Sequence, residues 1–276
     1  MGRYWLGCSG WAYDDWVGPF YPPGTPPSEF LARYARVFRT VEVDSSFYRA
    51  PSPFLVRRWT SVTPAGFRFT LKVPRDVTHP PRGTDGMAIL DRFLASLAPM
   101  REDGKLGAVV LQFPASFRAR ESARLVTLLG AVPREIPLAV ELRHGSWWTN
   151  ETRALLSDRG AVLVWSVLPD IRPPPWVTGD FLYARFIGDR ALTTFDRVQR
   201  DGRGDMEAMR QLFDKEGRAS ITVFAYSNNH FMGFGPGTVE VLADVLGEPH
   251  PVLDAATRLP GQSRLEDARS ESRPEG

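Results

Sequence analysis

Short runs of β-branched and aromatic residues alternate along this chain with longer segments in which apolar residues recur every three to four positions. The short runs are typical of buried strands and the longer segments of amphipathic helices. Eight strands are predicted, at residues 4–7, 41–44, 67–73, 108–112, 138–142, 162–165, 181–185 and 221–225. Strands and helices that alternate in this way indicate βα units and a parallel sheet.

Two of the predicted helices, residues 28–37 and 88–97, carry a clear apolar face. Ser28 is predicted to cap the first of them, and Thr149 is predicted to cap a later helix. The segment RPPPW at residues 172–176 is predicted to lie in a long loop, because proline does not continue a helix or a central strand.

Length and composition agree with one large domain. The chain has 276 residues, and α/β barrels usually need about 250. A hydrophobic content of 43% supports a sizeable core, and a mean hydropathy of -0.24 is ordinary for a soluble globular protein. Residues 255–276 contain few apolar side chains and are predicted to form a disordered tail, which leaves residues 1–250 for the barrel domain.

Several classes of protein are excluded or not favoured. The chain has no apolar run long enough to cross a membrane and no secretory signal at its start. Its one cysteine, Cys8, excludes an intrachain disulfide and agrees with a reducing cytoplasm. Cys8 could be a nucleophile, but a tight turn is the favoured interpretation. The net charge of +2 does not indicate nucleic-acid binding, and the oligomeric state stays open.

Polar residues follow the predicted strands, whereas apolar residues fill the strand beginnings. The eight strands could form an open sheet or a closed barrel. Closure is favoured because no edge strand is protected and no glycine-rich dinucleotide turn follows the first strand. We therefore predict a single (β/α)₈ barrel of the TIM type, with one functional site at the C-terminal ends of its strands.

Seven segments of the chain also carry a family resemblance. They read GCSGWAYDDWVGPFYP, FRTVEVDSSFYRAP, FRFTLKVPRDVTH, LGAVVLQFP, LAVELRHGSWW, FLYARFIG and VFAYSNNHFMGF. Together, over roughly residues 2–247, they resemble the DUF72 family, also called YecE-like proteins. The resemblance implies a TIM barrel but supplies no reaction. The family often has His-Gly where this chain has Ile187-Gly188, and Asp where it has Ser166, which weakens any role for those loops.

The second and third strands supply candidate catalytic groups. Glu42 and Asp44 are two residues apart on a strand and therefore share a face. A carboxylate in a barrel mouth must be paired, solvated or functional. Lys72 could bind an anion, form an imine with a carbonyl, or pair with Glu42, and the first and last of these are favoured.

The fifth strand ends in the densest cluster of chemistry, with Glu141, Arg143 and His144 within four residues. Glu141 could act as a base, Arg143 could bind a phosphate or carboxylate, and His144 could transfer a proton near neutral pH. The alternative is a structural ion pair between Glu141 and Arg143 that fixes the strand.

Further residues are predicted to bind the substrate. Arg185 at the end of the seventh strand, with Asn228 and Asn229 after the eighth, could form an anion cradle. Gln112 adds neutral hydrogen-bonding capacity.

Aromatic residues follow the first strand. Trp11 and Tyr13 could stack a base or a sugar, or could anchor the loop to the barrel.

A metal site is the alternative arrangement for the same mouth. His79, His144 and His230 follow the third, fifth and eighth strands and could bind a divalent metal together with Glu42 and Glu141. The chain has no compact H-E-x-x-H motif, and the strand-end cations would repel a metal. We therefore predict no cofactor and keep the divalent metal as an alternative.

Two acids and three strong bases facing one cavity favour an anionic ligand. The leading hypothesis is a hydrolase, lyase or isomerase that acts by general acid–base chemistry on a phosphorylated or nucleotide-like substrate. One alternative is a metal-dependent phosphoesterase or nuclease. A third is a module that binds a metabolite or nucleic acid without turnover.

Overall fold

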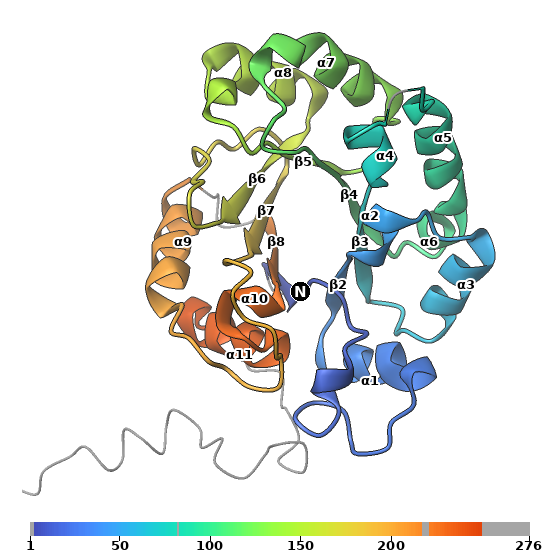
Figure 1. Cartoon of the computed structure of the whole chain (residues 1–276), viewed down its shortest axis with the longest axis vertical. Coiled ribbons are helices and arrows are strands. Elements are labelled where there is room, and N and C mark those ends of the chain that lie inside the picture. Colours follow the sequence, from blue (N-terminus) through green and yellow to red (C-terminus); the bar gives the residue numbers. More distant parts are fainter. Residues whose placement is uncertain (1–2, 82, 217–220, 250–276) are drawn as a thin grey trace, which may run out of the picture.

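The computed structural model describes residues 3–81, 83–216 and 221–249. Its eight strands form one parallel sheet in the order β1-β8-β7-β6-β5-β4-β3-β2, and they stand in a ring inside the helices (Figure 1). The strands are β1 Tyr4–Cys8, β2 Thr40–Val43, β3 Arg68–Lys72, β4 Leu106–Gln112, β5 Leu138–Glu141, β6 Val162–Val167, β7 Phe181–Phe186 and β8 Thr222–Ser227. This architecture confirms the predicted TIM-type barrel and all eight strands, whose ends differ from the predicted ones by at most two residues.

The barrel closes between β1 and β2 with little ladder pairing. Ser9 and Glu42 form an isolated parallel bridge, and the Gly10 N–H donates to the Glu42 carbonyl at 2.8 Å. Below this point, the Tyr34 hydroxyl accepts from the Cys8 N–H at 2.8 Å and donates to the Thr40 carbonyl at 2.9 Å. The Tyr34 side chain therefore joins the two strands where their backbones do not.

The α-helices are α1 Phe30–Val37, α2 Ser45–Tyr48, α3 Pro53–Ser61, α4 Arg75–Thr78, α5 Gly86–Ser96, α6 Ala98–Glu102, α7 Ser122–Ala131, α8 Asn150–Arg159, α9 Arg203–Glu216, α10 Asn229–Met232 and α11 Gly235–Leu246. The longer helices form an outer ring around the barrel, and the short helices α2 and α10 lie closer to the strands (Figure 1). Residues 168–180, between β6 and β7, contain no helix, in agreement with the loop predicted around residues 172–176. None of the helices in the described ranges is long and apolar enough to span a bilayer.

The helix termini test two predicted caps. The Thr149 side chain accepts from the Thr152 N–H and caps α8, as predicted. Ser28 does not cap α1, so that prediction is wrong. Pro27 starts a short 3₁₀-helix that includes Ser28, and α1 then follows directly from Glu29 without a side-chain cap.

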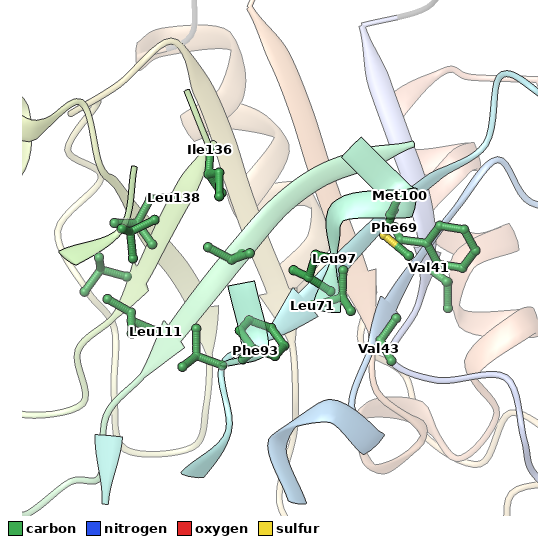
Figure 2. Packing of buried hydrophobic residues seen from close by; sticks show 14 of the residues in the cluster. Val41, Val43, Phe69, Leu71, Phe93, Leu97, Met100, Leu111, Ile136 and Leu138 are labelled. Carbon is green, nitrogen blue, oxygen red and sulfur yellow. The ribbon is translucent and has the colours of Figure 1, made fainter. Parts of the chain in front are cut away.

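Alternation along the strands divides the core into two parts. Outward-facing strand residues pack against the helices, and Figure 2 shows Val41 and Phe69 in this cluster with Met100 of α6. Inward-facing residues fill the barrel as a separate buried cluster that includes Trp5 and Tyr183. Since Val41 and Val43 point outward, Glu42 between them points inward. The predicted tail at 255–276 lies outside the described residues.

Candidate functional site

The charged strand-end residues meet inside the C-terminal mouth of the barrel. Arg185 of β7 is 2% exposed and bonds to carboxylates on two other strands. Its Nε and Nη2 donate to Glu42 Oε1 at 3.1 and 2.8 Å, and its Nη1 donates to Glu141 Oε2 and to Gln112 Oε1. Arg185 therefore links β2, β4, β5 and β7 through one guanidinium group.

Glu42 is buried, and its carboxylate accepts hydrogen bonds from Arg185, Ser9 and Tyr183. Besides Arg185, Oε1 accepts from the Ser9 hydroxyl and Oε2 from the Tyr183 hydroxyl, each at 2.8 Å. Burial alone would raise the pKa of Glu42, but Arg185 and Lys72, with these hydroxyls, outweigh it and lower that pKa. Glu42 is therefore held as an ionised carboxylate.

A hydroxyl chain continues from Glu42 into the barrel. Tyr183 hydrogen-bonds to Thr70 at 2.8 Å, and because Tyr183 donates to Glu42 it must accept from the Thr70 hydroxyl. Burial and the nearby Glu42 charge raise the pKa of Tyr183. The phenol therefore stays protonated and remains a hydrogen-bond donor.

Glu141 is also fully buried and lies between two arginines. Its Oε1 accepts from Arg143 Nε at 2.5 Å, while Oε2 accepts from Arg185. Burial would raise the pKa of Glu141, but Arg185, Arg143 and Lys72 outweigh it and hold the pKa at about 2. At neutral pH this carboxylate is a weak proton acceptor.

Lys72 and Asp44 form the more accessible ion pair of the mouth. Lys72 Nζ binds Asp44 Oδ1 and lies 3.7 Å from Glu42 Oε1. The Asp44 side chain is 24% exposed, against 8% for Lys72. The backbone turn into α2 brings Asp44 to Lys72. The network therefore has three acidic and three basic side chains, one acid more than the two acids and three bases predicted.

Arg143 is the most exposed basic side chain of the network. Its side chain is 22% exposed, and within the described part of the chain its hydrogen bond runs from Nε to Glu141, which leaves Nη1 and Nη2 without an acceptor. Burial and the positive charges of Arg75, Arg143 and Arg124 lower the pKa of the nearby His79. This edge of the mouth is therefore electropositive.

Ser166 adds an unused hydroxyl. It is 3% exposed and stands in register with Arg185 on the neighbouring strand. It alternates with Val162 and Val164, which belong to the cluster inside the barrel, so its side chain also faces inward. In the described chain its Oγ has no hydrogen-bond partner.

The asparagines predicted to join Arg185 in an anion cradle make other contacts. Asn228 caps α10 by accepting from the His230 N–H at 3.0 Å. Asn229 Oδ1 accepts from Trp16 Nε1 and from the Gly235 N–H. The structure brings neither of them into contact with Arg185.

The two predicted aromatic ligand contacts lie in the loop after β1 and are half-buried. The Tyr13 hydroxyl donates to the Ser9 carbonyl at 2.8 Å, and the Trp11 ring packs edge-on against Trp59, with 5.5 Å between centroids. Both contacts anchor the loop to the barrel.

The predicted metal ligands are each engaged separately. His79 Nδ1 contacts the Thr78 hydroxyl, His144 Nδ1 accepts from the Ser146 N–H, and His230 Nδ1 contacts the Leu192 carbonyl. Within residues 3–81, 83–216 and 221–249, no group of three or more His, Cys, Asp or Glu side chains is placed to hold a metal ion.

Sequence reasoning missed the role of two residues in this network. Tyr183 and Thr70 lie within predicted strands and are not among the predicted site residues, yet their hydroxyls lead to Glu42. A signal was present, since Tyr183 precedes Arg185 by two residues and Thr70 precedes Lys72 by two. Each therefore shares the inward face of a predicted site residue.

A closed barrel of parallel strands with buried charges at its C-terminal mouth defines a TIM-type α/β-barrel protein. The chain belongs to the DUF72 family, whose model, described as a protein of unknown function, matches residues 5–263. The family resemblance expected from the sequence is thereby confirmed.

Relatives and solved structures match this chain over nearly its whole length. The UPF0759 protein YecE of Escherichia coli strain K12 is 26% identical over 281 residues, which cover 95% of this chain and 99% of YecE. A DUF72 family crystal structure from Thermotoga maritima has a TM-score of 0.75 and 28% identity, covering 89% of this chain and 99% of that one. A DUF72 structure from Enterococcus faecalis has a TM-score of 0.72 and 23% identity, covering 90% and 99%, and shows the same fold.

Proposed function

We propose that this protein is an enzyme that binds a small anionic substrate, phosphorylated or nucleotide-like, in the mouth of the barrel and acts on it by general acid–base chemistry. One observation carries the proposal: three acidic and three basic side chains converge around buried Arg185 at the strand ends. Burying charges costs free energy, and apolar residues could stabilise the fold as well. Barrel proteins keep such costly groups at this end for function.

We assign a role to each charged residue of the mouth from the exposure of its side chain and from its hydrogen-bond partners. Arg143 is proposed to bind the anionic group, because both of its terminal nitrogens are open and a guanidinium binds phosphate or carboxylate in a bidentate manner. Ser166, in register with Arg185, offers a further hydroxyl in the same mouth. Arg185 is proposed to position Glu42 and Glu141, since its own nitrogens are occupied by those carboxylates and by Gln112.

The proton step is proposed to use Lys72 and Asp44. Glu141, with a pKa of about 2, and Glu42, with a lowered pKa, hold protons poorly while Arg185 binds them. Asp44 is the most exposed carboxylate of the network, and its ion pair with Lys72 is proposed to exchange with the ligand. His144, whose Nδ1 accepts from a backbone N–H, carries its proton on Nε2 when neutral and could donate to the substrate.

A thermal-shift experiment tests the binding part. Inorganic phosphate, sugar phosphates, nucleotides, dicarboxylates and divalent metals would each be added to the wild type, to Arg143→Ala and to Arg101→Ala. Arg101 is the matched control, since it also pairs with a glutamate, Glu135, but on the surface and ahead of β4. We expect phosphorylated compounds to raise the melting temperature of the wild type and of Arg101→Ala but not of Arg143→Ala.

Turnover of the stabilising compounds tests the chemical part. Asp44→Asn should still bind the compound and should lose turnover. If compounds bind but none is turned over, the protein is a binding module and the enzymatic proposal fails. If only a divalent metal stabilises the wild type, the anionic-ligand proposal fails and the histidines become the site. The proposal keeps the cytoplasmic location expected from the cysteine content.

A further inference from the structure

The segment that contains α2 and α3, directly after β2, has no acidic residues. Between Ser45 and Arg75 the sequence has no Asp or Glu. The basic residues in this stretch are Arg49, Arg57, Arg58, Arg68, Lys72 and Arg75. Arg49, Arg57, Arg58 and Arg75 are exposed, and none of these four forms an ion pair with any residue that the structure describes. Their charges are therefore available to a polyanion.

The same stretch exposes two aromatic rings. Tyr48 at the end of α2 is 72% exposed, and Phe54 in the first turn of α3 is 78% exposed. Among the described residues no other aromatic side chain stands out as exposed. Within α3, Phe54 and Arg58 are four residues apart and share one face of the helix, while Val56 and Trp59 on the other face are buried. The exposed face thus places arginines beside open ring faces.

A row of rings joins this stretch to the charged mouth. The Tyr48 ring contacts the Phe47 ring at 5.7 Å between centroids, and Phe47 contacts His79 at 5.5 Å. Lys72 Nζ lies 6.0 Å from the Phe47 ring centroid. Helix α2 follows β2 directly and contacts β3 (Figure 1). The row of rings therefore leads from α2 to Lys72, which pairs with Asp44.

We propose that the α2–α3 rim, defined by Tyr48, Arg49, Phe54, Arg57 and Arg58, binds single-stranded nucleic acid. Its bases would stack on Tyr48 and Phe54, its phosphates would contact the arginines, and its end would enter the mouth. Stacking on exposed rings requires bases that are not already paired, which selects a single strand over a duplex. The inference names the substrate class of the mouth and in that respect rests on the proposed function, whereas binding at the rim can be measured by itself.

Fluorescence anisotropy with a labelled oligothymidylate of about 12 nucleotides tests the rim. We expect the wild type to bind the single strand more tightly than the same length of duplex, with an affinity that falls as salt rises from about 50 to about 200 mM. Tyr48→Ala with Phe54→Ala should weaken binding by about tenfold or more, and so should Arg57→Glu with Arg58→Glu. Because all four side chains are exposed, these variants should keep the wild-type melting temperature.

Matched controls lie on α7 and α8, away from α2 and α3 (Figure 1). Val126→Ala on α7 removes another exposed apolar side chain, and Arg153→Glu on α8 reverses another exposed arginine. Both should bind the oligonucleotide as the wild type does. Equal binding of single strand and duplex, or unchanged binding by the aromatic variant, would overturn the inference. Binding to phosphatidylglycerol vesicles without binding to the oligonucleotide would overturn it as well.

The two proposals fail in different ways. If the oligonucleotide does not bind while inorganic phosphate still stabilises the wild type and not Arg143→Ala, the rim inference is wrong and the proposed function stands. If the oligonucleotide binds through the rim and phosphorylated compounds have no effect at Arg143, the rim inference stands and the proposed function is wrong.

Discussion

Arg185 binds Glu42 across the inside of the barrel, with Nε and Nη2 at 3.1 and 2.8 Å from the same carboxylate oxygen, although the two residues are 143 positions apart in the sequence. Their strands, β7 and β2, are not neighbours, since β8 and β1 lie between them. Both side chains are 2% exposed or less. The pair therefore fixes two distant strands relative to each other, and neither partner can lose the other without leaving a buried charge.

Replacement of Arg185 by methionine should destabilise the fold. The change leaves Glu42 and Glu141 buried without their main partner, which we expect to cost about 3–5 kcal/mol in the free energy of unfolding. Urea denaturation at neutral pH measures it. Arg185→Lys, which keeps the charge but loses the guanidinium fork, should cost less. A loss below about 1 kcal/mol for Arg185→Met would show that the two carboxylates find water or other partners.

Stability should depend on pH in the acid range. The pKa of Glu141 is held at about 2 in the folded protein, against a usual value of 4.5. A carboxyl whose pKa is lower in the folded state stabilises the fold above its unfolded pKa, and this stabilisation is lost as the pH falls toward the folded pKa. The free energy of unfolding should thus decline between about pH 4.5 and about pH 2, with Glu141 contributing on the order of 3 kcal/mol.

Urea denaturation of Glu141→Gln at a series of pH values isolates this contribution. The variant is less stable at neutral pH and should decline less steeply in acid, because its side chain does not titrate. Glu135→Gln is the control, since the Glu135 side chain is 63% exposed. It should follow the wild-type pH profile. Parallel profiles for wild type and Glu141→Gln would contradict the lowered pKa.

The Tyr183 hydroxyl should support the charge of Glu42. In Tyr183→Phe the Glu42 Oε2 atom loses its donor at 2.8 Å, and the Thr70 hydroxyl loses its acceptor. We expect a loss of about 1–3 kcal/mol and a rise in the pKa of Glu42, so that the acid decline starts at a higher pH. Tyr48→Phe removes an exposed hydroxyl and should change neither quantity. An unchanged acid transition in Tyr183→Phe would mean that the other partners of Glu42, chiefly Arg185 and Lys72, set its ionisation state without the phenol.

The barrel was predictable because inside and outside alternate strictly along its strands. In β2, Val41 and Val43 face the helices and Glu42 faces the mouth, and the sequence VEV carries that pattern directly. The position of Arg185 at a strand end could be predicted from the same alternation. The partners of Arg185 could not be predicted, because three cations and three acids at one mouth can pair in several ways. Only the three-dimensional register of the strands selects among these pairings.

Hydrogen bonds to backbone groups explain why the sequence did not predict the roles of Asn228 and Asn229 or the way in which β1 and β2 are joined. Asn228 and Asn229 follow a strand just as Glu42 and Arg185 do, but short helix α10 begins there and Asn228 satisfies its first N–H groups. The seam between β1 and β2 depends on Tyr34 from α1, whose helical spacing indicates only that it is buried. Its hydroxyl partners are backbone groups, which side-chain patterns do not reveal.

Removal of the Tyr34 hydroxyl should weaken the seam. In Tyr34→Phe the Cys8 N–H loses its acceptor and the Thr40 carbonyl its donor, and both groups lie in a fully buried setting. No neighbouring ladder bond replaces them, because the described pairing between β1 and β2 is limited to the isolated Ser9–Glu42 bridge just above. We expect a loss of about 1–3 kcal/mol in the free energy of unfolding and faster amide exchange at Cys8, while Tyr48→Phe changes neither. If Cys8 stays protected in Tyr34→Phe, the two strands close by direct contact and the seam does not depend on the hydroxyl.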